Sequence, residues 1–100
     1  MAEKEIIWSA LARLQFAHVL EFYVHRNGNS IYSLKILKEV EDLLETLSKT
    51  ERIGRLTSNK VTRVISMKVY LLFYEIQGNK IEILSFWDNR QDSENRKIKL

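Results

Sequence analysis

The sequence predicts an α+β fold, in which an N-terminal helical hairpin packs on one face of a small, mostly antiparallel, twisted sheet of about four strands. Three observations predict it: two stretches with helical spacing come first, three strand-like runs follow, and tight-turn residues separate the runs. At 100 residues, the chain has the length of one domain. We therefore treat residues 1–100 as a single domain.

The first helix is predicted from about Ala10 to His25, with Ser9 as its N-cap and Gly28 as a left-handed C-cap. Its apolar side chains recur at spacings of 4, 3 and 4 residues and form the face Ala12, Phe16, Val19 and Tyr23. The second helix is predicted over 31–47, and its apolar stripe is Ile31, Leu34, Leu37, Val40, Leu44 and Leu47. Four residues join the two helices, so they should form an antiparallel hairpin.

The strand-like runs are rich in β-branched and aromatic residues and cover Val61–Met67, Val69–Ile76 and Lys80–Trp87. A tight hairpin turn at Gly78 and Asn79 joins the last two runs. Because side chains alternate along a strand, the middle run places Tyr70, Leu72 and Tyr74 on one face and Val69, Leu71 and Phe73 on the other. A strand that is apolar on both faces belongs at the centre of a sheet. The apolar run over 5–8 suits an edge strand or the lead-in to the first helix.

The composition excludes several classes of site. The chain has no cysteine, so disulfides and cysteine-based zinc or iron–sulfur sites are excluded. No segment approaches the roughly 18 to 20 apolar residues of a spanning helix, and the N-terminus lacks the apolar run of a signal peptide. No Gly-rich phosphate loop or nucleophile elbow is present. We therefore expect a cytoplasmic protein with no membrane contact, no cofactor and no bound metal.

Positive charge is concentrated in the second half of the chain. Residues 1–50 hold 6 Lys or Arg against 7 Asp or Glu, whereas residues 51–100 hold 10 against 6. The excess is greatest over 49–68, where Glu51 is the only acidic residue among the cations Lys49, Arg52, Arg55, Lys60, Arg63 and Lys68. Such a cluster suits an anionic partner, either phosphates or an acidic protein segment, although a solvated basic loop has the same composition.

Short motifs follow one another along nearly the whole chain: Ile7-Trp8-Ser9, Arg26-Asn27-Gly28, Ile53-Gly54-Arg55, Tyr70-Leu71-Leu72-Phe73-Tyr74, and Ile83-Leu84 before Trp87-Asp88-Asn89-Arg90-Gln91-Asp92. Each is weak alone, but their order on a plan of helical hairpin and then sheet resembles the RelE/ParE superfamily of bacterial type II toxins. The resemblance implies a small toxin that arrests growth when it is free. Its partner would be a cognate antitoxin that wraps it in a toxin–antitoxin hetero-oligomer.

The two branches of this superfamily imply different targets, because RelE-like members cut messenger RNA on the ribosome and ParE-like members poison DNA gyrase. RNA cleavage needs groups that transfer protons and cations that stabilise the crowded phosphate. The RelE pattern has an arginine on the central strand where this chain has Leu71. A nuclease would then be left with Arg63, Lys60 and Arg90 for charge, and with Tyr74 or Asp88 for proton transfer.

The central strand and the residues from Arg90 to Asp92 resemble the ParE branch more closely. Trp87 and Asp88 depart from the His-Gly pair expected there, which puts the target in question. The resemblance favours a non-enzymatic inhibitor of DNA gyrase. The alternatives are a ribosome-dependent mRNA endoribonuclease and an inactive regulatory homologue.

The predicted target-binding residues combine the basic cluster with the polar motif: Arg55, Lys60, Arg63, Trp87, Asp88 and Arg90. Arg63 is the strongest candidate, because a long cation on an apolar strand has to reach solvent, a partner or a carboxylate. Arg55 has a structural alternative, which is to tie its loop to Glu75 or Asp88. Arg90 lies between two aspartates and has the alternative of pairing with them.

The predicted antitoxin-binding residues are Tyr70, Leu72, Tyr74 and Phe86. The helices can cover only one face of a sheet whose central strand is apolar on both sides. We therefore expect the other face to be an exposed groove, which an antitoxin helix or strand fills against apolar and basic residues.

Overall fold

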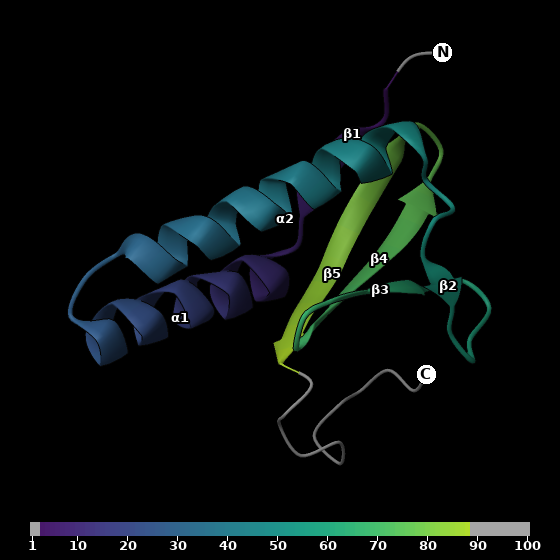
Figure 1. The fold of residues 1–100 in the computed structure, drawn as a ribbon. Helices are drawn as coiled ribbons and strands as arrows, with labels where there is room; N and C mark the ends of the chain where they lie inside the picture. The colour runs from purple at the N-terminus through teal and green to yellow at the C-terminus, as the bar shows by residue number, and fades with distance from the viewer. Residues whose placement is uncertain (1–2, 89–100) are drawn as a thin grey trace.

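The computed structural model describes residues 3–88. One strand precedes two long helices, and four strands follow them (Figure 1). In chain order the elements are β1 (Glu5–Trp8), α1 (Ala10–Asn27), α2 (Ile31–Lys49), β2 (Arg55–Leu56), β3 (Arg63–Met67), β4 (Tyr70–Gln77) and β5 (Lys80–Asp88). No helix among these is long and apolar enough to cross a membrane.

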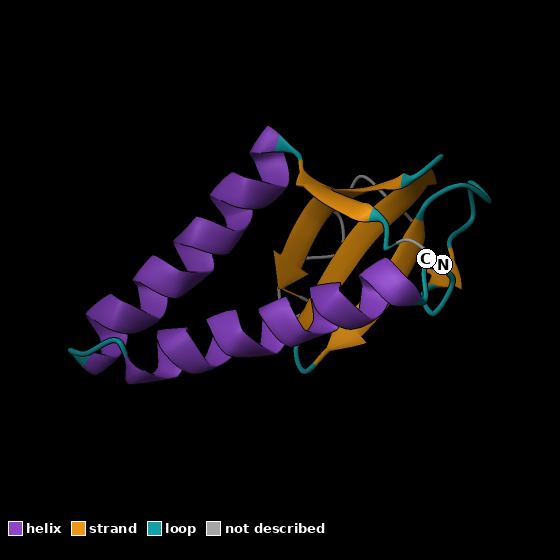
Figure 2. Ribbon diagram, turned by 90° about the horizontal axis from the view of Figure 1, so that it is seen from above, coloured by secondary structure: helices purple, strands orange, loops and turns teal. Residues whose placement is uncertain are grey.

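The strands form one sheet of five, in the order β1-β5-β4-β3-β2. β1 pairs in parallel with β5, and every other neighbouring pair is antiparallel. Both helices lie on the same face of this sheet (Figures 1 and 2). The predicted α+β class and the N-terminal edge strand are confirmed. The additional strand is β2, two residues long, which forms within the segment predicted to be a basic loop.

The first helix begins at Ala10 as predicted, continues two residues beyond His25 to Asn27, and stops at the predicted cap Gly28. The Oγ of Ser9 accepts a hydrogen bond of 3.0 Å from the N–H of Ala12, which satisfies one of the free amides of the first turn. At the other end Gly28 adopts φ 72°, and its N–H donates to the carbonyl of Val24. The predicted core face is also confirmed, because Ala12 and Tyr23 are buried and the two residues between them pack against the core.

The second helix does not bury the predicted stripe along its whole length. Ile31 and Leu34 are 75% and 58% exposed, whereas Ser33 and Ile36 are buried in their place. The physical reason is that the tip of the hairpin extends beyond the sheet (Figure 1), so the first turns of α2 face α1 alone. There the hydroxyl of Ser33 donates to the carbonyl of Leu20 over 2.6 Å. At its first turns, α2 is therefore rotated so that Ser33 faces α1. The spacing of the apolar residues alone predicted that Ile31 and Leu34 would face inward.

The main core lies between the helices and the sheet. Phe16 is half-buried and packs against this core, where its ring stacks on Trp8 at 5.3 Å between centroids and meets Phe86 edge-on at 5.0 Å. On the opposite face of the sheet, a second buried cluster contains Val64, Leu71 and Phe73, with Leu84 and Trp87 packed against it. This second cluster corrects the prediction of an exposed groove on that face, because its three central side chains are at most 4% exposed.

Candidate functional site

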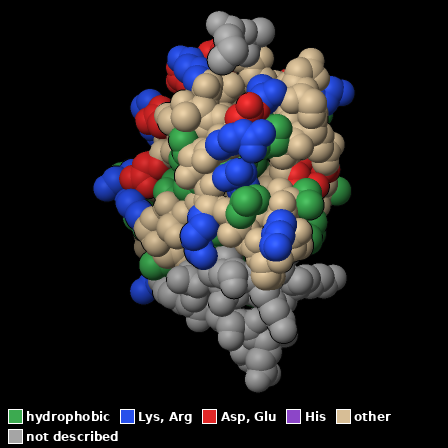
Figure 3. Space-filling model, turned by 90° about the vertical axis from the view of Figure 1, so that its right-hand side faces the viewer, with side chains coloured by type: hydrophobic (Ala, Val, Ile, Leu, Met, Phe, Trp, Pro, Cys, Tyr) green, Lys and Arg blue, Asp and Glu red, His purple; other side chains and the backbone are tan. Residues whose placement is uncertain are grey.

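The loop around β2 presents cations and aliphatic side chains to solvent. We call this the basic loop surface, and it consists of Arg52, Ile53, Arg55, Leu56, Lys60 and Val61, all exposed. Figure 3 shows blue Lys and Arg side chains gathered on this side of the molecule with hydrophobic side chains between them. Its three cations make no ion pair with any residue of 3–88, and the nearby acid Glu51 is paired with Lys4 at 2.9 Å. Their charge is therefore available to a partner.

Tyr74 anchors this loop to the sheet. Its hydroxyl donates to the carbonyl of Glu51 over 2.7 Å and accepts from the N–H of Gly54 over 2.9 Å. Gly54 is required for this approach, since a Cβ at that position would lie 2.6 Å from the tyrosine oxygen. Burial raises the pKa of Tyr74, and its side chain has no exposure to solvent. Proton transfer by Tyr74 in a nuclease stays a prediction, and the two hydrogen bonds of its hydroxyl argue against it.

Arg63 lies beneath the same loop. Its Nη1 donates to the carbonyl of Gly54 over 2.6 Å and approaches the carbonyl of Arg52 at 3.5 Å. The sequence predicted that this cation reaches solvent, a partner or a carboxylate. The structure instead shows that it binds backbone carbonyls, and sequence spacing gave no sign of them. Arg63 is therefore a residue that positions the basic loop surface.

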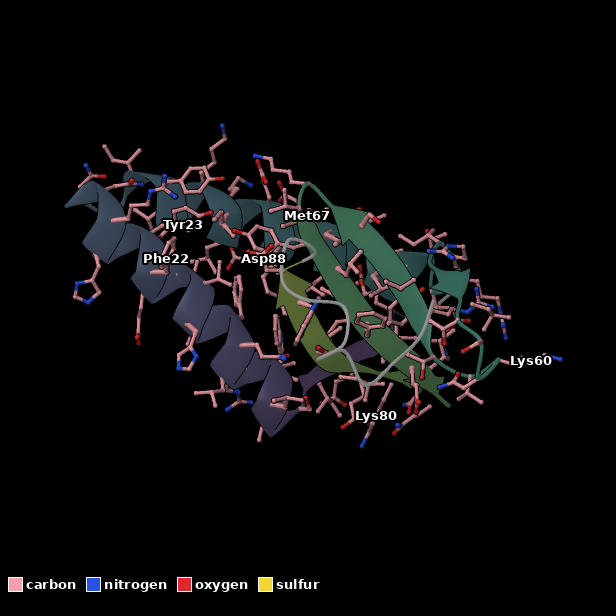
Figure 4. All side chains as sticks on the ribbon, turned by 90° about the horizontal axis from the view of Figure 1, so that it is seen from below. Phe22, Tyr23, Lys60, Met67, Lys80 and Asp88 are labelled. Carbon is pink, nitrogen blue, oxygen red and sulfur yellow. The ribbon has the colours of Figure 1, made fainter. Side chains whose placement is uncertain are left out.

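Asn59 organises the tip of the loop. Its Oδ1 accepts hydrogen bonds of 2.8 Å from the N–H groups of both Val61 and Thr62, so β3 begins two residues later than predicted. The hydroxyl of Thr62 in turn donates to Glu75 over 3.0 Å. The proposed tie between Arg55 and Glu75 is absent from the described residues, and Thr62 bonds to one oxygen of that carboxylate. Lys60 lies at the tip with φ 63°, an uncommon backbone conformation for a residue other than glycine (Figure 4).

The polar motif at the end of β5 lies away from the basic loop surface. Asp88 on β5 is paired with Tyr70 on β4, which is in turn paired with Met67 on β3. Met67 and Arg63 are at opposite ends of β3, four residues or about 13 Å apart along the strand. Asp88 therefore lies at the end of the sheet away from Arg63. Trp87 is half-buried against the second cluster, and its Nε1 is buried without a hydrogen bond. The predicted target-binding residues therefore form two separate groups, and Arg90 lies outside the described residues.

A pocket of about 350 Å³ opens beside Asp88, between α1 and the end of the sheet. We call it the α1 pocket, and it is lined by Gln15, His18, Val19, Phe22, Tyr23, Tyr70, Phe86 and Asp88. Two of the four predicted antitoxin-binding residues, Tyr70 and Phe86, form part of its wall. The other two, Leu72 and Tyr74, are fully buried in the main core, and their role in antitoxin binding stays a prediction.

Sequence reasoning missed an exposed apolar stripe on α1. Leu11, Leu14 and Phe22 are each more than half exposed, and together with His18 they follow one another at spacings of 3, 4 and 4. These four residues, which we call the α1 stripe, lie along one side of the helix and are distinct from its core face. The sequence could have revealed this stripe, because α1 has apolar residues on two of its sides. The prediction considered only the side that forms the core. His18 and Phe22 belong to both the stripe and the α1 pocket.

The described residues form surfaces suited to binding and show no arrangement of groups suited to catalysis. Tyr74 and Arg63, two of the five nuclease candidates, are held by backbone groups, and Lys60 is at a loop tip with no acid or base bonded to it. Within residues 3–88, no three His, Cys, Asp or Glu side chains gather in a way that could bind a metal ion. The chemistry that remains is recognition of an anionic and aliphatic partner by the loop, and of an apolar partner by α1.

Comparison with known proteins adds two findings. The family model of the ParE toxin of the type II toxin–antitoxin system parDE matches residues 6–93. No curated protein matches the chain. A solved structure of the chromosomal ParDE toxin–antitoxin system from P. aeruginosa is similar, with a TM-score of 0.58, 20% identity, and coverage of 84% of this chain and 94% of that chain. At this identity the likeness shows a shared fold.

Proposed function

The chain belongs to the ParE toxin family of type II toxin–antitoxin systems, and from this premise we propose that it is a toxin that binds and inhibits DNA gyrase until a cognate antitoxin neutralises it. Gyrase acts in the cytoplasm, so this function requires a cytoplasmic protein. The proposed activity is inhibition by binding and needs no bond to be broken by the toxin itself.

The observation that carries the proposal is the basic loop surface. Its exposed cations are interleaved with exposed aliphatic side chains, and a buried tyrosine, a glycine and an arginine hold the loop on the sheet. Such a surface can attract an anionic partner and then bury apolar area against it. The rigid support lowers the entropy that is lost when a loop is ordered on binding.

The nuclease alternative is weaker on chemical grounds. General acid–base catalysis needs a titratable group within hydrogen-bond reach of the reacting oxygen. The hydroxyl of Tyr74 is already bonded to Glu51 and Gly54, and Leu71 stands where a nuclease would carry an arginine. Among the described residues, the basic loop surface therefore has cations without a proton-transfer partner.

The α1 stripe and the α1 pocket support the antitoxin half of the proposal. Small soluble domains rarely leave several large apolar side chains exposed along one helix face unless a partner covers them. An antitoxin segment lying along α1 would cover Leu11, Leu14 and Phe22. It would leave the basic loop surface untouched, because that surface is at the other side of the molecule (Figures 1 and 4).

The test is a supercoiling assay with purified gyrase, the full chain, and two double variants. We expect the chain to inhibit supercoiling, and Arg55→Ala/Lys60→Ala to weaken this inhibition by about tenfold or more, since charged interface contacts are commonly worth about 1.5–3 kcal/mol. Lys35→Ala/Lys80→Ala removes the same charge from exposed positions elsewhere and should inhibit like the parent chain. Cleaved messages in a translation extract, with supercoiling unaffected, would replace this proposal with the nuclease.

A further inference from the structure

Lys4 lies directly before β1, where three segments of the chain meet. Its backbone N–H donates to the carbonyl of Ser48 near the end of α2 over 3.0 Å. Its ammonium donates to the carbonyl of Gly78 in the turn between β4 and β5, and it pairs with the carboxylate of Glu51 at 2.9 Å. The two charged side chains are 22% and 30% exposed. Backbone groups of the helix and the turn therefore hold the ammonium next to this carboxylate.

Glu51 is the only acidic residue of the loop around β2, and it lies among cations. Its carbonyl accepts the hydrogen bond of the Tyr74 hydroxyl. Burial raises the pKa of Tyr74, and the N–H of Gly54 and the positive charges of Arg63 and Arg52 oppose that rise. Both guanidinium groups therefore lie close to the hydroxyl that Glu51 binds. A Glu51 carboxylate without an ion-pair partner would be attracted to them.

We propose that Lys4 is a positioning residue of the basic loop surface, which masks the only acid of the loop and so keeps Arg52 and Arg55 free to bind an acidic patch of the target protein. Ion pairing inside the loop would compete with the partner, because a guanidinium that bonds within the chain has fewer N–H groups left to donate. The exposed side chains of Ile53 and Leu56 favour a protein patch over phosphates, since aliphatic groups bury area against a protein surface. The inference rests on the proposed function, because it concerns the same surface.

The rival explanation is that the ion pair of Lys4 and Glu51 only ties the N-terminal segment to the loop. A tie is lost whichever of its ends is removed, so both single variants would then weaken binding alike. Masking predicts opposite signs. Removal of the lysine charge leaves an unpaired carboxylate among the loop cations, whereas removal of the carboxylate charge leaves the cations without an internal competitor. The two explanations therefore differ in the sign of one measurement.

The first experiment measures the Kd for purified gyrase of the full chain and three variants. We expect Lys4→Met to weaken binding by about fivefold, the size typical of one exposed charge pair, and Glu51→Gln to tighten it by about twofold. The double variant, which restores the net charge of the parent chain, should bind within about twofold of the parent. Lys35→Met and Glu21→Gln make the same chemical changes at exposed positions of the helical hairpin and should bind normally.

A second experiment replaces gyrase with a small acidic probe. Hexaglutamate, titrated into the labelled full chain and followed by NMR, should shift signals of Arg52, Arg55 and Leu56. Its affinity should rank Glu51→Gln above the parent chain and the parent above Lys4→Met. The differences should shrink in about 0.5 M salt, because salt screens exposed charges. A structural tie would not produce this dependence on salt.

Amide hydrogen exchange at Gly54 shows whether the loop keeps its place, since this N–H donates to the Tyr74 hydroxyl. We expect its exchange rate to be the same in Lys4→Met as in the parent chain.

Equal weakening of binding by Lys4→Met and Glu51→Gln, without rescue in the double variant, would overturn the inference in favour of a structural tie. Normal binding of gyrase and of hexaglutamate by all three variants would overturn it as well. If the parent chain does not bind gyrase but the hexaglutamate affinities keep the expected order, the proposed target is rejected and masking by Lys4 is supported.

Discussion

Tyr70 and Tyr74 lie four residues apart on the same face of β4, and neither is more than 1% exposed. The hydroxyl of Tyr74 makes two hydrogen bonds, both to the backbone of the loop before β2. The hydroxyl of Tyr70 meets the side chain of Tyr23, at the wall of the α1 pocket. One strand therefore carries one tyrosine that ties a loop to the sheet and another that meets a side chain of the neighbouring helix.

The difference comes from what lies over each ring. Over Tyr74 the chain itself returns, and Gly54 lets its backbone approach to hydrogen-bond distance. Over Tyr70 the neighbouring element is α1, whose backbone groups are already bonded within the helix. A helix can offer only side chains, and those next to Tyr70 are largely aromatic. The four predictions below test this contrast and are ordered by the size of the expected effect.

The largest effect is expected for Gly54→Ala. The new Cβ would lie 2.6 Å from the Tyr74 oxygen, and the loop has no room to move without breaking both hydrogen bonds of that oxygen. We expect a loss of about 3 kcal/mol in the free energy of unfolding, measured by urea denaturation. In a Tyr74→Leu background the same change should cost much less. An equal loss of unfolding free energy in both backgrounds would show that the effect of Gly54→Ala does not come from a clash with Tyr74.

Tyr74→Phe should destabilise the chain by about 2 kcal/mol. It removes one oxygen and leaves the N–H of Gly54 and the carbonyl of Glu51 without their buried partner. Amide hydrogen exchange should report faster exchange at Gly54. If stability and exchange are both unchanged, water replaces the hydroxyl, and the loop is less tightly held than the distances indicate.

Alkaline pH should destabilise the chain more steeply than an average protein of its size. Burial raises the pKa of both tyrosines in the folded chain, so the folded state keeps protons that the unfolded state releases above about pH 10. Stability is thus fully present below that pH and is lost as the pH rises. Each tyrosine contributes about 1.4 kcal/mol per pH unit to the loss. Between pH 8 and 11, the urea midpoint should fall less steeply for Tyr70→Phe than for the parent chain. Identical slopes would show that the pKa of Tyr70 is the same in the folded and unfolded chain.

The smallest effect is expected for Tyr70→Phe. It should destabilise the free chain by about 1 kcal/mol or less, because its hydroxyl interacts with the side chain of Tyr23 and leaves no backbone group without a partner, whereas Tyr74→Phe does. Thermal unfolding of the two variants side by side measures the difference, since both lose the same atom from the same strand. A destabilisation equal to that of Tyr74→Phe would show that the two hydroxyls stabilise the fold equally.

The sequence predicted those features that depend on neighbours along the chain. Ser9 and Gly28 bound α1 because capping is local, and the alternation in β4 predicted the two faces of the sheet correctly. The predicted inward face of α2 was wrong at its first turns, because Ser33 faces α1 and bonds to a carbonyl of that helix. The central position of β4 and the edge position of β1 followed from the rules of sheet packing, whereas the parallel pairing of β1 with β5 was not predicted.

The candidate site was predicted less well, and the failures share a cause. The partners of Arg63 and Tyr74 are backbone atoms of a distant loop, which side-chain patterns do not reveal. The α1 pocket exists because the helical hairpin overhangs the sheet, and no residue pattern encodes that overhang. The exposed loop cations Arg55 and Lys60 were predicted from charge alone, and the structure keeps them together in one surface. Their binding role stays a prediction.

The position of β5 has a consequence for folding during synthesis. Among the described residues this strand is the last in sequence, yet it lies between β1 and β4 in the sheet, and α1 packs on it. Until Lys80 and the residues after it are made, β1 has no strand to pair with, and the nascent chain exposes the apolar surface that β5 covers. The complete sheet that supports the helical hairpin therefore forms only after β5 has been synthesised. We expect an antitoxin that is already present to meet the chain as it folds.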